Sequence, residues 1–339
     1  MSTPSCLVTA VLLGCVGGGS LLGQETRYTE RIEVRKVVLE VRILGRDNLP
    51  ILGLTAGDFT VTVDGVKVPV ETAEWITETV PYASGPTPAQ AAESGVPAAQ
   101  PGRVLVFLFQ TDYAAGRATG LVRMSLQAKK FLDTLEPDDV IAVLSFDSHL
   151  KLRSDFTTDR AETDRAVQAA IRFGDPEPLQ PRPGLALATS FDLSAARHAA
   201  TLESGLLVLA RALSAIPGPK SIVLFGWGMG RFSREGVTLS ADYARAQHLL
   251  VAARTTIFAL DITDADSHSL EVGLQTAASG TGGLYARTHL FPGVAMSRLE
   301  SALAGHYELV FEAPPNTEQI RVEVAGAPAS VFHRTTTAN

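Results

Sequence analysis

Val104-Leu-Val-Phe-Leu-Phe109 is apolar at every position, and a segment with helical spacing, 118–135, follows it. Val140-Ile-Ala-Val-Leu-Ser-Phe146 repeats this apolar texture after that segment. Strands that are buried on both faces carry near-continuous apolar runs, whereas strands with one solvated face alternate apolar and polar residues. The two runs therefore predict neighbouring central strands of a sheet that is covered on both faces.

The alternation of strand and helix continues toward the C-terminus. A single long helix is expected at 192–216, and further apolar runs and helical segments follow at 221–225, 241–254, 256–260, 270–278 and 292–303. Repeated strand–helix units predict right-handed crossovers and helices on both faces of a mostly parallel sheet. The predicted fold class is therefore α/β, a doubly wound, Rossmann-like domain, which we place at 103–305.

Strand-like texture flanks this domain on both sides. Before it, Asp64-Gly65 separates two β-rich runs, which is a strong signal for a two-residue hairpin. We expect an N-terminal β module at 24–80 and the C-terminal segment 306–339 to pack together as a small β-sandwich, with the α/β domain inserted between them. The stretch 81–102 is rich in Pro and Ala and is predicted to be a linker.

Composition narrows the classes of function. The chain has 339 residues, a net charge of -7 and a pI of about 5.5, without a run of Lys or Arg. Nucleic acids and anionic membranes attract basic patches, so neither is expected as a partner. After residue 23, no segment of the sequence is apolar for long enough to form a transmembrane helix.

The first charged side chain is that of Glu25, and the stretch 1–23 holds a short apolar run followed by small residues. This layout is typical of a signal peptide, with a buried N-terminal strand as the alternative. Cleavage near Glu25 would remove both cysteines, Cys6 and Cys15, and leave a mature chain without thiols. The residues ending at Cys15 resemble a lipoprotein box, but Leu13 fits that motif poorly, so no lipid anchor is expected. The protein is predicted to be secreted or periplasmic.

Four phrases along the chain resemble segments of one known family, in that family's order. They are Gly53-Leu-Thr-Ala-Gly-Asp-Phe59 with Asp64-Gly65, the stretch Phe131 to Phe146, Gly218-Pro-Lys-Ser-Ile-Val-Leu-Phe225, and Ala277-Ala-Ser-Gly-Thr-Gly-Gly283 followed by His306-Tyr-Glu-Leu-Val310. The chain is similar to the von Willebrand factor A family, in particular to the VWFA-related proteins common in acidobacteria. The resemblance implies a bacterial protein with the von Willebrand A fold that binds another protein.

That family binds a divalent cation through a DxSxS motif after the first strand, with a Thr and an Asp from two later loops. The resemblance places Gln110, Asp112 and Ala114 at the first, third and fifth motif positions, and Thr189 as the middle Thr. Mg²⁺ takes oxygen ligands in near-octahedral geometry, and of these residues only Asp112 offers a charge. The metal site is therefore interpreted as degenerate and no cofactor is expected, with weak Mg²⁺ binding by Asp112, Gln110 and Thr189 as the alternative.

The loop that supplies the third metal ligand in the family reads Gly226-Trp-Gly-Met-Gly230 here and holds no carboxylate. A Trp among glycines either folds onto the protein body or anchors a partner. The loop at 110–116 is expected to lie beside it. The candidate partner-binding residues come from these two loops: Trp227, Gly226, Gly228, Met229 and Tyr113.

Other motifs predict turns rather than sites. The glycine spacing at 226–230 departs from the phosphate-binding pattern G-x-G-x-x-G, and no Walker lysine follows it. Asp261-Ile-Thr-Asp264-Ala-Asp266 lacks the EF-hand spacing and its final Glu, which favours turn and cap chemistry. The sequence has no G-x-S-x-G motif to anchor a hydrolase triad.

These observations favour an extracytoplasmic, non-enzymatic module for adhesion or scaffolding that binds another protein. The first alternative is a Mg²⁺-dependent sensor or assembly factor of the von Willebrand A type that uses Asp112. A hydrolase of doubly wound type is the third interpretation.

Overall fold

The computed structural model describes residues 35–78, 102–176, 179, 184–314, 317, 319–326 and 328–336. The expected signal peptide at 1–23, with Cys6 and Cys15, and the expected linker as far as residue 101 lie outside these residues. None of the described helices is both long enough and apolar enough to cross a membrane.

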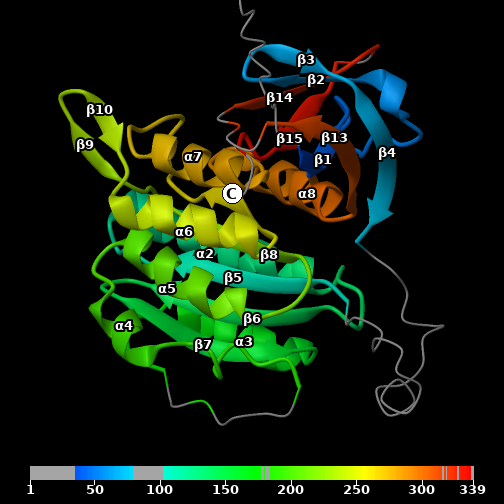
Figure 1. The fold of residues 1–339 in the computed structure, drawn as a ribbon. Helices are drawn as coiled ribbons and strands as arrows, with labels where there is room; N and C mark the ends of the chain where they lie inside the picture. Colours follow the sequence, from blue (N-terminus) through cyan, green and yellow to red (C-terminus); the bar gives the residue numbers. More distant parts are fainter. Residues whose placement is uncertain are drawn as a thin grey trace, which may run out of the picture. The chain divides into compact units, whose positions relative to one another are not determined.

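The central sheet of the α/β part has the strand order β12-β11-β8-β5-β6-β7, and Figure 1 labels four of its strands, β8, β5, β6 and β7, in this order. Its strands are β5 (Val104–Gln110), β6 (Val140–Phe146), β7 (Leu150–Thr157), β8 (Lys220–Gly226), β11 (Thr255–Asp261) and β12 (Tyr285–Arg287). Numbered along the chain, this order is 3-2-1-4-5-6, that of doubly wound sheets. Only the edge strand β7 runs antiparallel to its neighbour. Every residue of β5, β8 and β11 is buried, so the fold class predicted from the apolar runs is confirmed.

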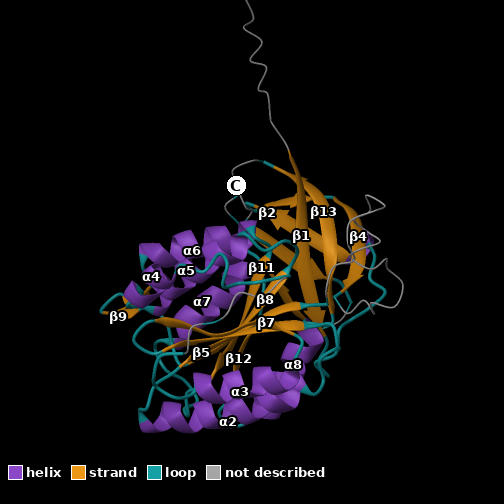
Figure 2. Cartoon of the chain, turned by 90° about the horizontal axis from the view of Figure 1, so that it is seen from below, coloured by secondary structure: helices purple, strands orange, loops and turns teal. Residues whose placement is uncertain are grey.

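Helices cover both faces of this sheet (Figure 2). One face packs against α2 (Ala115–Leu132), α3 (Arg160–Ala170) and α8 (Pro292–Ala302). The other face packs against α4 (Leu193–His198), α5 (Leu202–Ser214), α6 (Ala241–Ala252) and α7 (Glu271–Thr281). Alternate residues of β5 point to opposite faces of the sheet. Phe107 therefore lies in the core on the side of α2, α3 and α8, and Leu108 lies in the core on the side of α4 to α7.

The single helix expected at 192–216 is two helices, α4 and α5. The backbone at Thr201 is extended, and its side chain accepts a hydrogen bond from the N–H of Ser204, which completes a capping box. A side chain that satisfies the free N–H groups of a new first turn stabilises a helix start at that position. The prediction was wrong because the apolar periodicity continues across this break.

A β-hairpin that the sequence reading did not predict follows β8. Its strands are β9 (Arg231–Ser233) and β10 (Gly236–Thr238), which pair antiparallel. They form a separate two-stranded sheet on the chain between β8 and α6.

The N- and C-terminal segments form two further sheets. In the first, β1 (Arg35–Leu44) pairs antiparallel with both β13 (Gly305–Ala313) and β15 (Ser330–His333), and β4 (Val70–Thr77) pairs with β13. In the second, β2 (Phe59–Val63) pairs with β3 (Val66–Val68) and β14 (Ile320–Val324), after a short 3-10 helix, η1 (Ala56–Asp58).

Apolar side chains of the two sheets share one core cluster, so the terminal segments form the expected β-sandwich. Leu39, Val61 and Tyr307 are among its most buried members. The hairpin between β2 and β3 turns at Asp64 and Gly65, whose φ angles are 48° and 84°. Two central residues with positive φ are what a two-residue turn of type I′ requires, as Asp-Gly predicted.

Candidate functional site

The carboxyl ends of the parallel strands form the edge of the central sheet at which doubly wound folds bind ligands. β5 pairs with β8 in parallel, from Val104↔Lys220 to Phe109↔Phe225. The loops at 110–116 and 226–231 therefore leave the sheet side by side, as expected.

Gln110 joins these two loops. Its side-chain Nε2 donates to the carbonyl oxygen of Gly228 at 2.9 Å, and its Oε1 accepts from the N–H of Trp227 at 2.9 Å and of Gly228 at 3.3 Å. A Cβ added at Gly226 would meet this Oε1 at 3.2 Å, so the glycine gives the amide room. Both ends of the buried amide thus bind backbone, which occupies the oxygen that could have served a cation.

The Asp112 carboxylate interacts with two groups at the start of α2. Its Oδ1 accepts from the N–H of Ala114 at 2.8 Å, and its Oδ2 pairs with the guanidinium of Arg117 in the first turn of α2. Burial raises the pKa of the Asp112 carboxyl, but the Ala114 N–H and the Arg117 guanidinium outweigh it, so the pKa lies below its usual value. A carboxylate that a guanidinium already neutralises is a poor first ligand for a divalent cation.

Trp227 lies under the same arginine. The Arg117 guanidinium carbon is 3.6 Å from the centroid of the Trp227 ring, a cation–π arrangement. The indole is half-buried and packs against the core cluster beneath α2. Asp112, Arg117 and Trp227 thus form one stack, the Arg117 cluster, in which the protein's own cation bridges a carboxylate and an aromatic ring.

An aromatic pair stands in the open beside this cluster. Tyr113 is 58% exposed and Phe173 is 49% exposed, with ring centroids 4.1 Å apart at an interplanar angle of 64°. The Tyr113 hydroxyl accepts a hydrogen bond from the Phe173 N–H at 3.1 Å, which fixes the pair. Phe173 was not predicted from the sequence, because no local sequence pattern connects it with a tyrosine 60 residues earlier.

The remaining predicted partner contacts support the loop from within. Met229 lies in the core, and Gly226 and Gly228 are buried. Gly228 has a φ of 151°, and a Cβ there would meet the Cβ of Leu270 at 2.6 Å. These three residues therefore shape the loop that carries Trp227, and they offer a partner no side chain.

The structure does not bring Thr189 to Asp112. The adjacent Ser190 donates its hydroxyl to the Ala212 carbonyl in the last turn of α5, 2.9 Å away. That turn directly precedes β8, so it lies at the amino ends of the parallel strands, opposite the edge that carries Asp112. Thr189 is therefore excluded as a ligand beside Asp112; the loop before it was too divergent to locate from the sequence.

A second acidic group follows β11 at the same edge. Ligand atoms of Asp261, His268 and Glu271 lie within 4.8 Å of one another. Arg287 donates twice to Glu271, at 2.8 and 2.7 Å, and the Tyr285 hydroxyl donates to Asp261 at 2.8 Å. Because the Arg287 hydrogen bonds dominate, the pKa of Glu271 is lowered. These donors hold the Asp261 and Glu271 side chains against β12. The turn chemistry expected at Asp261 is a separate contact, in which the Thr263 N–H donates to the Asp261 Oδ1 at 2.9 Å.

No protein-family model matches the sequence, and no curated protein matches it. Among solved structures, it is similar to a von Willebrand factor type A protein from Catenulispora acidiphila, with 11% identity, a TM-score of 0.42, and coverage of 92% of this chain and 76% of that one.

Two further solved structures show a comparable likeness. BatB from Bacteroides thetaiotaomicron has 12% identity, a TM-score of 0.37, and coverage of 59% of this chain and 98% of that one. The manganese-loaded TRAP protein of Plasmodium vivax has 9% identity, a TM-score of 0.38, and coverage of 75% and 82%. Such values carry no information on activity. By its own strand order and layering, the chain has a doubly wound, mostly parallel α/β fold with helices on both faces of the sheet.

Proposed function

We propose that this chain is a non-enzymatic protein-binding module that contacts its partner through the carboxyl edge of the central sheet. The exposed Tyr113–Phe173 pair carries this proposal. Exposed aromatic side chains held in a fixed geometry contribute strongly to protein interfaces, because they bury a large area and lose little conformational entropy. They also stand at the edge where folds of this type bind ligands.

We further propose that the binding needs no divalent cation. At this edge, Arg117 already pairs with Asp112, and Arg287 with Glu271. Each carboxylate therefore has a fixed internal counter-ion, which also leaves neither free to act as a general base. A cation that bound Asp112 or Glu271 would have to displace a guanidinium.

The partner surface is testable by quantitative capture from the native envelope fraction. Wild-type protein is compared with the double variant Tyr113→Ala/Phe173→Ala, and Leu52→Ala serves as the control, because Leu52 is also highly exposed but precedes η1 in the β module. We expect the double variant to retain the melting temperature and to bind the partner at least about tenfold more weakly. Equal capture by wild type and double variant would exclude this surface.

The same capture, repeated in EDTA and in excess Mg²⁺, tests the cation. We expect no difference between the two conditions. Capture that requires Mg²⁺ and is lost in Asp112→Ala would instead support a Mg²⁺-dependent sensor or assembly factor.

We also propose export, on the ground of the uncharged stretch 1–23. The intact mass of the protein recovered outside the cytoplasm should correspond to a chain that begins near Gln24 or Glu25. A cytoplasmic product that retains Cys6 would refute this.

A further inference from the structure

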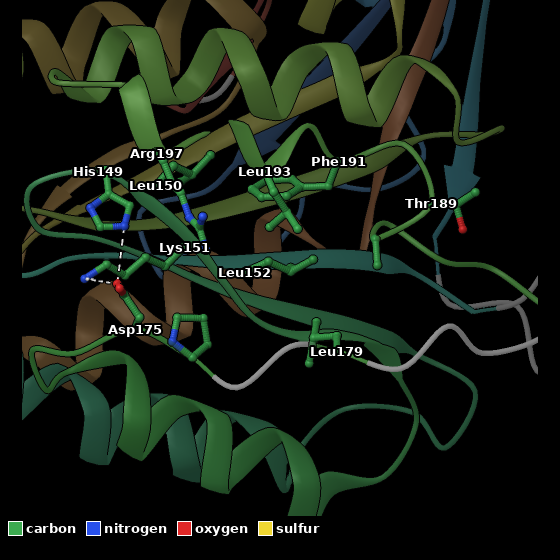
Figure 3. Close-up of a pocket in the computed structure, with 12 residues that line it drawn as sticks. His149, Leu150, Lys151, Leu152, Asp175, Leu179, Thr189, Phe191, Leu193 and Arg197 are labelled. Carbon is green, nitrogen blue, oxygen red and sulfur yellow. Dashed lines mark ion pairs between the residues drawn. The ribbon is translucent and has the colours of Figure 1, made fainter. Parts of the chain in front are cut away.

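A cavity of about 240 Å³ lies beside β7, against the residues that lead into α4 (Figure 3). It is larger than the roughly 150 Å³ that is known to hold a benzene molecule in a protein core. This cavity is separate from the Arg117 cluster and from the Tyr113–Phe173 pair, neither of which lines it. A ligand here would therefore be independent of the protein partner proposed above.

One end of the cavity is apolar. Leu152 and Phe191 are buried in its wall, while Leu193, the first residue of α4, is 63% exposed. Figure 3 shows these three side chains together, with Arg197 of the same helix beside Leu193. Covering this exposed leucine with an apolar chain is favourable, because it removes apolar surface from water.

The other end is charged and already holds a carboxylate. Asp175 is an exposed residue, its side chain 70% accessible, yet its Oδ1 lies 3.3 Å from the Lys151 Nζ and 3.4 Å from the His149 Nε2. The Lys151 ammonium is itself buried and is anchored by Asp147 at 2.6 Å. The mouth of the cavity thus presents two fixed nitrogen donors to a carboxylate that is held loosely.

Arg197 adds a further positive charge at this end. Its guanidinium lines the cavity on the side of His149 and has no ion pair within the described part of the chain (Figure 3). Since Asp147 neutralises Lys151, the charges left among the residues that line the cavity are those of Arg197 and Asp175, with His149 beside them. A second carboxylate that displaced Asp175 would gain Arg197 as well as the two nitrogen donors.

We propose that this cavity binds a small amphipathic monocarboxylate, a molecule with one carboxylate and one unbranched apolar chain. The carboxylate takes the position of the Asp175 side chain between His149, Lys151 and Arg197. The chain runs along Leu152 and Phe191 and covers Leu193. Charge complementarity fixes the orientation, and apolar burial contributes the affinity.

The test compares two probes of equal chain length, octanoate and octanol, by titration calorimetry on the full chain. We expect octanoate to bind more tightly than octanol. Arg197→Gln should weaken octanoate about tenfold, since it removes a charge-assisted contact, and should leave octanol unchanged. Asp175→Asn should strengthen octanoate, because the internal competitor loses its charge. Leu193→Gln should weaken both probes, and Leu52→Gln neither.

Three results would overturn the proposal. They are the absence of saturable octanoate binding by the folded wild type, equal affinities for octanoate and octanol, and an Asp175→Asn variant that binds octanoate no better than wild type. The Tyr113→Ala/Phe173→Ala variant should bind octanoate normally, so that failure of the protein-binding proposal and failure of this one can be told apart.

Discussion

The cluster of Arg42, Glu78 and His306 and the Arg117 cluster each pair an arginine with a carboxylate, but they differ in burial. In the β module, Arg42, Glu78 and His306 are buried, with side chains 3%, 9% and 1% exposed. In the Arg117 cluster, the Asp112 and Arg117 side chains are 27% and 31% exposed. Removing one partner of a buried ion pair leaves an uncompensated charge in the interior, which strongly lowers the stability of the fold. In an exposed pair, water solvates the remaining charge, and the loss of stability is small. We therefore expect the first cluster to contribute strongly to the stability of the fold. The second cluster should contribute little, and it lies at a surface that is accessible to a partner.

The largest effect is expected from Glu78→Ala. Glu78 accepts from Arg42 at 2.7 Å and lies 2.8 Å from the His306 Nδ1, and Arg42 also donates to the Ala302 carbonyl at the end of α8. Removing the carboxylate should lower the free energy of unfolding by up to about 3–5 kcal/mol, because Arg42 stays buried with only Glu40, 3.8 Å away, as a counter-charge. Urea denaturation measures this, with Glu78→Gln as the milder control; a loss below about 1 kcal/mol would show the cluster to be solvated.

The second-largest loss of stability is expected from Gln110→Glu. This substitution places a charge at the buried, uncharged side chain that joins the loops after β5 and β8. The new carboxylate would face the Gly228 carbonyl to which Nε2 now donates, while keeping the two N–H donors on its other oxygen. We expect a loss of about 1–3 kcal/mol in the free energy of unfolding at neutral pH. An unchanged denaturation midpoint would mean that Gln110 does not hold the two loops together.

The pH dependence of the melting temperature tests the contribution of the Glu78 carboxylate to stability. Burial raises the pKa of its carboxyl, but the charges and hydrogen bonds of Arg42 and His306 outweigh it, so the folded pKa lies below the ordinary value of 4.5. A depressed pKa contributes stability above pH 4.5 that is lost as the pH falls through the folded value. The fall in melting temperature from neutral to acid pH should therefore be smaller in Glu78→Gln than in wild type. Equal falls would assign the acid sensitivity to other carboxylates.

The fold was predictable because its main signals are local. Apolar runs such as Val104–Phe109 mark the central strands, and Asp64-Gly65 marks a hairpin. The break at Thr201 was missed because a capping side chain overrides a periodicity that continues through it. Strand order also brought the loops after β5 and β8 together, so the location of the candidate site was predictable.

The contacts within the site were not predictable in the same way. Arg117 pairs with Asp112 five positions earlier, but it stacks on Trp227 from a different strand's loop. Phe173 meets Tyr113 through the path of the chain after α3. Each such contact depends on where loops of unrelated sequence come to lie, and residue types alone do not specify it.

The smallest effect is expected from Asp112→Ala, and it tests the exposed half of the comparison. The variant loses the ion pair with Arg117 and the hydrogen bond from the Ala114 N–H, both in reach of water, while Arg117 remains over the Trp227 ring, so the free energy of unfolding should change by about 1 kcal/mol or less. A cation that binds the folded state alone raises the melting temperature by mass action. Asp112 is the one charged residue among Gln110, Asp112 and Ala114, the positions at which metal ligands were expected from the sequence. We therefore expect thermal unfolding with and without Mg²⁺ to coincide in wild type, in Asp112→Ala and in the control Asp112→Asn. A rise with Mg²⁺ in wild type that vanishes in Asp112→Ala would show that the cation displaces Arg117.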